Sequence, residues 1–305
     1  MSNQKSTSPT TEHYKGRVIV SHRSEAIVES TDNNTFLCKS KKGIGRTICG
    51  DNVTFHPINE NEGIIQSIQA RSSTLTRPDS RGKLKSIAAN IDQLIIVSAI
   101  VPEINFELID RYIVAARMLK ISPVILLNKI DLVDDTDSYD DEMDVYIKLG
   151  IKVIYTSIKA EDGMKSLRNA LNKNISILVG QSGVGKSSLI KQLIPDLDIR
   201  IGEISSYHLE GKHTTTSTNL YHLDCGGDII DSPGVRNFRL WNLSPHEIQS
   251  GFDEIVESSH KCKFNNCLHK KEPGCNVRED IRGGNITQRR LDSFHAIIQS
   301  LELKY

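Results

Sequence analysis

The most constraining feature of this sequence is a glycine-rich loop between an apolar run, ISILVG, and a helix-like run, SLIKQLI. The loop has the pattern G-x-x-x-x-G-K-[ST], and a strand before it and a helix after it make the pattern a strong signal. Glycines let backbone N–H groups point inward, where they and the helix N-terminus can cradle a phosphate. The predicted phosphate-contacting residues are Gly180, Gln181, Ser182, Gly183, Val184, Gly185, Lys186, Ser187 and Ser188.

Four positions have specific expected roles in binding phosphate and Mg²⁺. Lys186 is expected to reach the β- and γ-phosphates, and the Ser187 hydroxyl to coordinate Mg²⁺. Downstream, the stretch DIIDSPG has the pattern D-x-x-G from Asp231 to Gly234. This pattern suits a carboxylate that holds Mg²⁺ through water and a glycine N–H that faces the γ-phosphate.

A base-recognition motif, NKID, occupies residues 128–131. The Asp131 carboxylate can accept hydrogen bonds from the ring N–H and the amine of guanine, whereas adenine presents an acceptor there. A site built to receive a donor rejects an analogue that lacks it by roughly 10⁴-fold. Asn128 is expected to brace the loop and the Lys129 stem to cover the base. The alternative is a surface turn, and an ATPase or kinase remains the competing nucleotide class.

The order of these motifs along the chain is unusual. The base motif precedes the phosphate loop, and the D-x-x-G segment follows the phosphate loop. This order is a circular permutation of the usual GTPase order. Because chain termini commonly lie close together, such a permutation preserves the sheet. The sequence therefore predicts a circularly permuted P-loop GTPase domain over residues 87–245.

The hydrophobic periodicity of this segment predicts strands that alternate with helices. The apolar runs DQLIIVSAI, PVILLNKIDLV and KVIYTS read as buried strands, and GMKSLRNALNK as a helix. In FELIDRYIVAARMLK one helical face carries Leu108, Ile109, Tyr112, Ile113, Ala116 and Leu119. The strands NLYHLD and DIIDSP flank a Cys-Gly-Gly turn. Alternating strands and helices imply a parallel sheet.

Residues 14–70 have a different pattern, with five short alternating runs between turn signals. This spacing predicts an all-β barrel, with an OB-type barrel as the leading candidate and other small barrels fitting nearly as well. Residues 1–13 are expected to be a disordered tail. Residues 71–86 carry five basic residues without sustained periodicity, so they read equally as a linker or as a nucleic-acid-facing loop.

The C-terminal segment, residues 246–305, is expected to be a mostly helical zinc-binding domain. Cys262, Cys267, His269 and Cys275 lie within fourteen residues, and this Cys₃His set suits a closed, structural tetrahedral zinc site. Lysines flank the ligands and are expected either to touch phosphate or to be solvated. The other three cysteines lie in strand-like contexts and read as core residues.

The composition excludes several other classes of protein. Thirty-eight basic residues balance thirty-eight acidic ones, so no overall field marks the chain as a binder of nucleic acid or membranes. The first dozen residues lack an apolar signal core, and the longest apolar run is too short to span a bilayer. We therefore expect a cytoplasmic protein with no membrane partner.

Taken together, these motifs resemble the RsgA family, also called YjeQ, of circularly permuted GTPases of small ribosomal subunit biogenesis. The likeness runs from Tyr14 onward and rests on TRP, IDRYIVAAR, NKID, GQSGVGKSSL, GKHTTT, DSPGVR and the Cys-Cys-His-Cys knuckle ending in PGC. It implies an OB domain, a permuted GTPase and a zinc domain that bind the small subunit and its rRNA near the decoding region. GTP and GDP are the implied ligands, and we expect a monomer.

The resemblance also assigns roles to residues outside the clear motifs. Thr215 matches the switch threonine expected on Mg²⁺, with Thr214 as the second candidate. Ser157 and Ile158 match the guanine-backing motif loosely. Val235 stands where a glutamine would orient the attacking water, so His213 is the candidate catalytic residue beside Lys186 and Thr215, the alternative being a histidine that merely lies on a switch loop.

The expected function is GTP hydrolysis during late maturation of the small subunit, with hydrolysis timing release from ribosomal RNA. The alternative is a switch in which GTP or GDP occupancy controls ribosome binding with little hydrolysis. Multiple-turnover phosphate release with and without small subunits separates the two.

Overall fold

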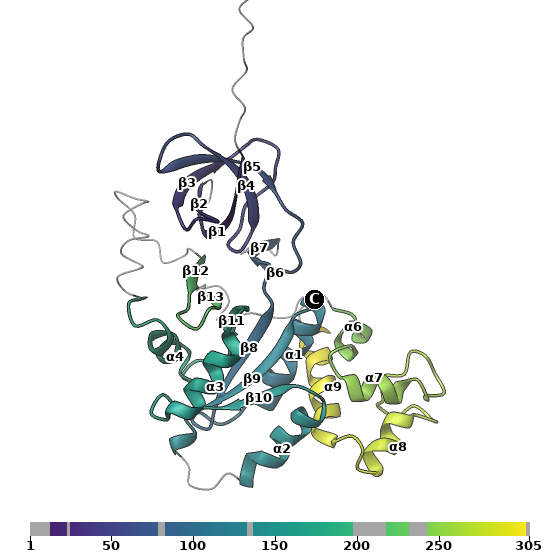
Figure 1. Cartoon of the computed structure of the whole chain (residues 1–305). Coiled ribbons are helices and arrows are strands. Elements are labelled where there is room, and N and C mark those ends of the chain that lie inside the picture. The colour runs from purple at the N-terminus through teal and green to yellow at the C-terminus, as the bar shows by residue number, and fades with distance from the viewer. Residues whose placement is uncertain are drawn as a thin grey trace, which may run out of the picture.

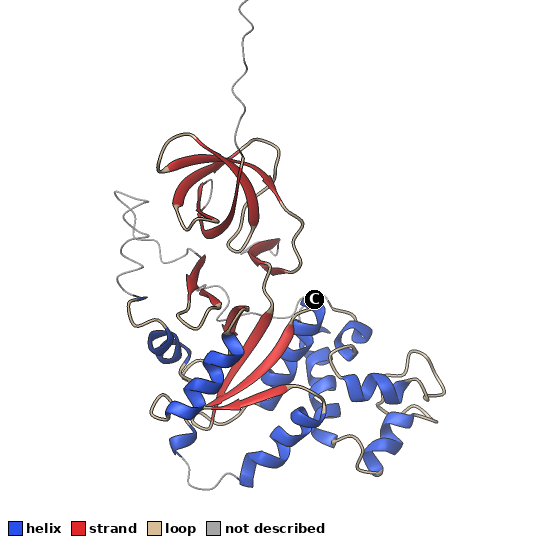
Figure 2. Cartoon of the chain, in the orientation of Figure 1, coloured by secondary structure: helices blue, strands red, loops and turns tan. Residues whose placement is uncertain are grey.

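The structure is a computed structural model, and it describes residues 13–22, 25–78, 83–132, 137–197, 218–231 and 243–302. A β-barrel lies at the top of Figure 1, an α/β unit lies below it, and a helical region formed by the end of the chain packs beside that unit. In Figure 2 the strands belong to the first two parts and the helices to the last two.

The barrel contains all five predicted strands. They are β1 (Tyr14–His22), β2 (Glu25–Ser30), β3 (Thr35–Ser40), β4 (Asn52–Pro57) and β5 (Glu62–Ile68). Neighbours pair in the order β1-β2-β3-β5-β4, and β4 pairs back with β1, which closes the barrel. Alternate residues such as Val53 and Phe55 point into a core that is fully buried. The predicted OB-type barrel is confirmed.

Residues 71–86 differ from the expectation of an irregular segment. They contain β6 (Thr74–Pro78) and the start of β7 (Leu84–Ala89), which pair as an antiparallel ribbon. The expectation failed because the ribbon buries few side chains and carries charged residues on its exposed face, so its alternation is weak. At the barrel side, Arg71 donates to both carboxylate oxygens of the buried Asp51, at 2.7 and 2.9 Å.

The α/β unit has a sheet in the order β10-β9-β8-β11-β13-β12. Its parallel strands are β8 (Gln93–Ala99), β9 (Ser122–Asn128), β10 (Lys152–Tyr155), β11 (Ile175–Val179) and β13 (Asp228–Asp231), and β12 (Thr218–His222) is antiparallel to β13. The parallel strands read as continuous apolar runs because both faces of the sheet are covered. The predicted parallel sheet is confirmed.

Helices cover the two faces of this sheet. On one face, α1 (Phe106–Leu119) and α2 (Asp137–Lys148) share a core with Leu94 and Ile96 of β8. On the other face, α3 (Glu161–Leu171) and α4 (Lys186–Leu193) share a core with Ile95 and Val97 of the same strand. Successive residues of β8 therefore support opposite layers, as the alternation of a strand requires.

The barrel and the α/β unit form one continuous hydrogen-bonded sheet. β1 pairs with β12 in antiparallel register, with Val20 opposite Asn219 and Ser21 opposite Thr218. Charged side chains reinforce this junction: Arg17 donates to Asp228 at 2.8 Å, and the His222 ring lies 2.6 Å from Asp228 and 2.8 Å from Glu29. These contacts tie the barrel to the β12–β13 hairpin.

His222 makes this junction sensitive to pH. Hydrogen bonds to Asp228 and then to Glu29 raise the pKa of His222 to about 9. We therefore expect its stabilisation to be complete below pH ~6.5, the ordinary pKa of histidine, and to be lost as the pH rises through about 9. His222 is half exposed, so the effect should be about 1 kcal/mol or less. Thermal melts should show His222→Gln further below the parent at pH 6 than at pH 10.

A matched control for this measurement is His246→Gln, which changes an exposed histidine far from the junction. Its difference from the parent should not follow the same pH course. A His222→Gln difference that is equal at pH 6 and pH 10 would contradict the assigned ion pairs.

The C-terminal region is mostly helical, as predicted. Its helices are α6 (Pro245–Gln249), α7 (Asp253–Ser259), α8 (Asn276–Arg282) and α9 (Gln288–Glu302). Their apolar faces form a core that includes Val114 and Ala115 of α1. The helix α1 is thus buried on two sides, one against the sheet and one against the C-terminal helices.

A buried ionic cluster joins these C-terminal helices to the α/β unit. Asp110 of α1 is fully buried and accepts hydrogen bonds from Arg290 at 2.6 Å, Arg289 at 2.9 Å and Tyr146 at 2.6 Å. Arg290 is 1% exposed and also donates to both oxygens of Glu254. Buried charges of this kind are tolerated when they are paired, and these pairs link the C-terminal helices to α1.

The three cysteines outside the predicted metal site differ in burial. Cys38 and Cys49 are buried, as expected of core residues, whereas Cys225 lies half-buried in the turn between β12 and β13. Within the described ranges, no helix combines the length and the hydropathy that crossing a bilayer would require.

Candidate nucleotide and metal sites

The predicted nucleotide-binding residues lie at one edge of the sheet. Asn128 ends β9, Gly180 follows β11, Asp231 ends β13, and Ser157 comes two residues after β10. Because the parallel strands run in the same direction, their carboxyl ends meet at this edge, which is where open α/β sheets bind ligands. The fold therefore brings together segments that are separated by up to a hundred residues.

The phosphate loop has the backbone that its glycines predict. Gly180, Gly183 and Gly185 all have positive φ, at 144°, 84° and 98°. A Cβ atom on Gly180 would come within 2.1 Å of the Val97 carbonyl oxygen, so only glycine fits beside β8. The helix α4 begins directly after Gly185 at Lys186. Its N-terminus is thus aimed at the position where the loop can hold a phosphate.

The side chains of the loop also have defined positions. The Lys186 ammonium donates to the carbonyl oxygens of Gly180 at 2.7 Å and Gln181 at 2.6 Å, so its side chain returns to the start of the loop. Ser187 and Ser188 are exposed in the first turn of α4, and Val184 is buried beneath the loop. The Ser187 hydroxyl can therefore reach a cation at the loop.

The base motif contacts the phosphate loop directly. The Asn128 amide donates to the Val184 carbonyl oxygen at 2.9 Å, and the Lys129 ammonium donates to the Gly183 carbonyl oxygen at 2.7 Å. A Cβ atom on Gly185 would come within 2.4 Å of the Asn128 amide nitrogen, so this contact also requires a glycine. The two predicted motifs are therefore in direct contact.

Asp131 lies in a short 3₁₀ turn, Ile130–Leu132, beside the loop that follows β10. One carboxylate oxygen accepts a hydrogen bond from the Ser157 hydroxyl at 2.6 Å, and the other lies 2.9 Å from the Lys159 ammonium. The Ser157 hydrogen bond, and then the one from Lys159, lower the pKa of Asp131. The carboxylate is thus ionised at neutral pH and oriented as an acceptor. Ile158 is 47% exposed at the same place and can pack on a flat base.

Asp231, the predicted Mg²⁺ carboxylate, ends the strand next to β11, and β11 leads into the predicted phosphate loop. Its strand, β13, is the parallel neighbour of β11, and Asp231 stands opposite Asn219 of β12. This position places a carboxylate at the same edge as Ser187. The predicted residues His213, Thr215 and Gly234, together with Thr214 and Val235, lie outside the described residues.

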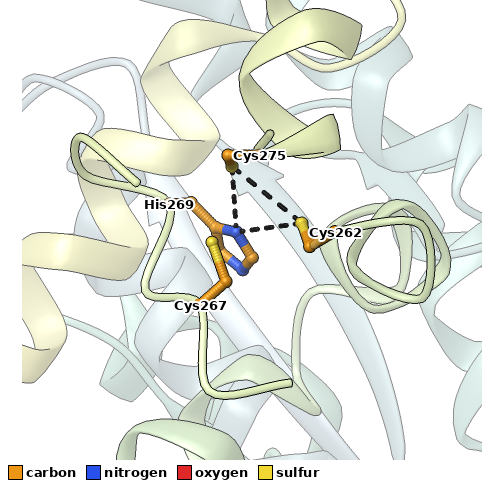
Figure 3. Close-up of side chains that lie close together, drawn as sticks. All are labelled: Cys262, Cys267, His269 and Cys275. Carbon is orange, nitrogen blue, oxygen red and sulfur yellow. Dashed lines mark hydrogen bonds between the residues drawn. The ribbon is translucent and has the colours of Figure 1, made fainter. Parts of the chain in front are cut away.

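The predicted metal ligands converge in the C-terminal region (Figure 3). The ligand atoms of Cys262, Cys267, His269 and Cys275 all lie within 4.8 Å of one another. The sulfur atoms of Cys262 and Cys275 are 4.0 Å apart, and His269 Nδ1 is 3.4 Å from the Cys275 sulfur. In a tetrahedral site with bonds of about 2.3 Å the sulfurs are roughly 3.8 Å apart, so this cluster can hold a metal ion.

The surroundings of this cluster favour metal coordination. His269 Nε2 lies 3.4 Å from the Gln249 side-chain oxygen, which leaves Nδ1 free to face the cysteines. The Asn276 backbone N–H donates to the Cys262 sulfur at 3.3 Å. Burial raises the pKa of Cys267 to about 12 and lowers that of His269. A neutral imidazole is a ready ligand, and a bound metal would displace the thiol protons.

Several residues of these sites were not singled out from the sequence. The Lys159 ammonium forms an ion pair with Asp131. Its position two residues after Ser157 is the sequence signal that could have identified it. The loop after β8 supplies the Val101 carbonyl oxygen to Lys129 at 2.7 Å. Gln249 supports His269 from twenty residues away. The last two contacts join distant segments, so no local sequence pattern predicts them.

Known proteins resemble this chain over most of its length. A family model described as RsgA GTPase matches residues 68–241. The small ribosomal subunit biogenesis GTPase RsgA of Yersinia pseudotuberculosis is 44% identical over 298 residues, covering 94% of this chain and 85% of the relative. The protein of the same name from Saccharophagus degradans is 45% identical over 300 residues, covering 94% and 87%.

Solved structures agree with this likeness. The crystal structure of YjeQ from Thermotoga maritima is 29% identical with a TM-score of 0.79, covering 96% of this chain and all of that one. The structure of YloQ, described as a circularly permuted GTPase, is 26% identical with a TM-score of 0.77, covering 98% and 99%. These likenesses confirm the predicted barrel and permuted α/β unit.

Proposed function

This chain belongs to the RsgA GTPase family and is a GTPase, and we propose that it acts as a late maturation factor of the small ribosomal subunit. In this proposal it binds the subunit and its ribosomal RNA as a monomer in the cytoplasm. Hydrolysis of GTP to GDP and phosphate times its release. The relatives named above carry the biogenesis role in their names, which is the support for the choice of partner.

One observation carries the nucleotide assignment. The base motif and the phosphate loop are joined by the hydrogen bonds from Asn128 to Val184 and from Lys129 to Gly183. A single guanosine triphosphate can therefore place its guanine on Asp131 while its phosphates lie against Lys186 and the loop amides. Ser157 and Ile158 would line the base on its other side.

The proposed catalytic roles follow from this placement. Lys186 and the backbone amides of residues 180–188 would stabilise the charge that develops on the β- and γ-phosphates. Mg²⁺, held by Ser187, Asp231 and Thr215, would neutralise phosphate charge. Gly234 would donate its N–H to the γ-phosphate, and His213 would position the attacking water. These last assignments rest on the sequence motifs alone.

We further propose that the Cys₃His cluster holds one structural zinc ion. Three thiolates and an imidazole are a soft, closed donor set, and all four come from one short segment. A structural metal would stiffen residues 261–276, which connect α7 to α8 beside several lysines. That rigid surface would serve binding rather than chemistry.

A GTPase titration with purified ribosomal subunits tests the proposed function. Turnover of the free protein should be slow, because partners that complete a GTPase site can supply factors of about 10³ to 10⁵. We expect small subunits, but not large ones, to raise multiple-turnover phosphate release on the order of tenfold or more.

The alternative proposal is an occupancy switch with little hydrolysis. It predicts that affinity for the small subunit differs between the GTP and GDP forms while phosphate release stays at the free-protein rate. Stimulation by both subunits alike would remove the small subunit from the proposal.

A further inference from the structure

The four predicted metal ligands differ in their exposure to solvent. Cys267, His269 and Cys275 are buried, whereas Cys262 is partly exposed. The chain has six cysteines, all within the described residues, and only one other, Cys225, is partly exposed. A reagent in solution therefore meets the Cys₃His cluster at Cys262 first.

The chemistry of metal binding makes an exposed ligand sulfur a target for oxidants. Cysteine binds zinc only as the thiolate, and the thiolate is also the form that peroxides oxidise. Susceptibility to oxidation follows thiolate character and exposure together. In the zinc-bound protein Cys262 would meet both conditions, whereas the buried Cys267 and Cys275 would meet only the first. Cys225 lies outside the cluster, so no metal bound there would hold its sulfur as a thiolate.

A second sulfur lies where it can react with an oxidised Cys262. The sulfur atoms of Cys262 and Cys275 are 4.0 Å apart, and Figure 3 shows both side chains directed into the same space. Two backbone contacts keep the neighbouring segments side by side. The Lys263 N–H donates to the Gly274 carbonyl oxygen at 3.0 Å, and the Asn276 N–H donates to the Cys262 sulfur at 3.3 Å. To form a disulfide, the two sulfurs need to approach each other by only about 2 Å.

We propose that Cys262 is an oxidation site for hydrogen peroxide and that Cys275 converts the oxidised sulfur into a disulfide. The Cys262 thiolate attacks one peroxide oxygen, the O–O bond breaks, and a sulfenic acid and a hydroxide ion form. The Cys275 thiolate then attacks the Cys262 sulfur, the S–O bond breaks, and a second hydroxide leaves. The two sulfurs lose two electrons and the peroxide gains them, and both hydroxide ions take protons from solvent.

The disulfide would remove two of the four ligands and release the metal. It would keep the end of α7 tied to the start of α8, because its two cysteines lie beside these helices. The segment between the two cysteines would lose its metal anchor, and it carries two exposed lysines, Lys270 and Lys271. This inference goes beyond the proposed GTPase function and rests only on the proposed zinc ion.

Treatment of the zinc-loaded, full-length protein with hydrogen peroxide tests this inference. A chromogenic chelator reports zinc release, and mass spectrometry of non-reduced peptides identifies the disulfide. We expect one zinc ion to leave for each Cys262–Cys275 disulfide that forms, and zinc to bind again after reduction with a dithiol. Trypsin should cut after Lys270 or Lys271 faster in the oxidised protein than in the reduced, zinc-loaded protein, because the metal no longer holds this segment.

Two variants separate oxidation at Cys262 from general oxidative damage. Cys225→Ser removes the other partly exposed thiol and should release zinc at the parental rate. Cys262→His replaces the thiolate with an imidazole, which is also a zinc ligand, so it should keep the metal and lose the release driven by peroxide. If Cys262→His binds no zinc, the disulfide mapped in the parent protein decides the question.

Two results would overturn the inference and leave the zinc site in place. One is zinc that stays bound at peroxide concentrations that oxidise Cys225, and the other is a first disulfide that does not include Cys262. A purified protein without zinc would instead remove the proposed metal, and the inference would fail with it. None of these results bears on GTP hydrolysis, whose proposed residues lie at the carboxyl edge of the sheet.

Discussion

Asp131→Asn is expected to lower kcat/KM for GTP by about 10⁴-fold and to transfer the preference to XTP. In the proposed complex, guanine would present two donors to the Asp131 carboxylate, its ring N–H and its amine. An asparagine amide would place a donor against one of them and lose a hydrogen bond to a charged group. Xanthine carries a carbonyl oxygen in place of the amine, so the same amide could donate to it.

The structure makes this substitution a clean test. Ser157 and Lys159 both donate to Asp131, so the side chain is oriented before any ligand binds, and a remaining carbonyl oxygen could still accept one of these bonds. The measurement is steady-state phosphate release with GTP, XTP and ATP. Asp141→Asn, in an exposed position of α2, is the matched control and should leave all three rates unchanged. Undiminished use of GTP by Asp131→Asn would place the base elsewhere.

Cys275→Ser is expected to abolish stoichiometric zinc binding and to destabilise the C-terminal region. A structural zinc ion contributes on the order of 10 kcal/mol of apparent binding free energy, which is comparable with the whole stability of a domain. Cys275 is buried in the same core as Phe252 and Phe294, so loss of the metal would also loosen that packing. Limited proteolysis should therefore cut within residues 246–302 of the variant first.

Metal analysis of the purified protein checks the first part of this expectation, and thermal melting with and without a chelator checks the second. Cys225→Ser is the matched control, because Cys225 lies in the β12–β13 turn outside the cluster. It should retain one zinc per chain. A Cys275→Ser protein with full zinc content, or a parent that melts identically in chelator, would exclude a structural role for the metal.

Local patterns predicted the elements that are buried on both sides or built around glycine. The β8 and β9 strands are unbroken apolar runs because helices cover both faces of the sheet, and such runs are visible without any tertiary information. The positive φ values of Gly180, Gly183 and Gly185 follow from the phosphate loop that the motif describes. The four predicted metal ligands were equally visible, because one short segment supplies them all.

The β6–β7 ribbon was not predicted, because few of its side chains are buried. It places Leu75 and Ala88 in the core but exposes Arg77, Leu84 and Lys85, so its alternation is too weak to indicate strands. The helix α1 shows a related limit. Its predicted face packs on the sheet, but its other side buries Asp110 and Val114. From the sequence alone, an aspartate on a helix is expected to be solvated. The structure instead pairs Asp110 with Arg290.

The sequence by itself determined the chemistry of each motif, the permuted order of the motifs, and the types of most helices and strands, because these depend on residues close together in the chain. Only the tertiary structure decided that Asn128 donates to Val184, that β1 of the barrel pairs with β12, and that Asp110 meets Arg290. Each of these contacts joins segments between 56 and about 200 residues apart. Local periodicity carries no information about such partners, because their pairing is set by how the layers pack around a shared core.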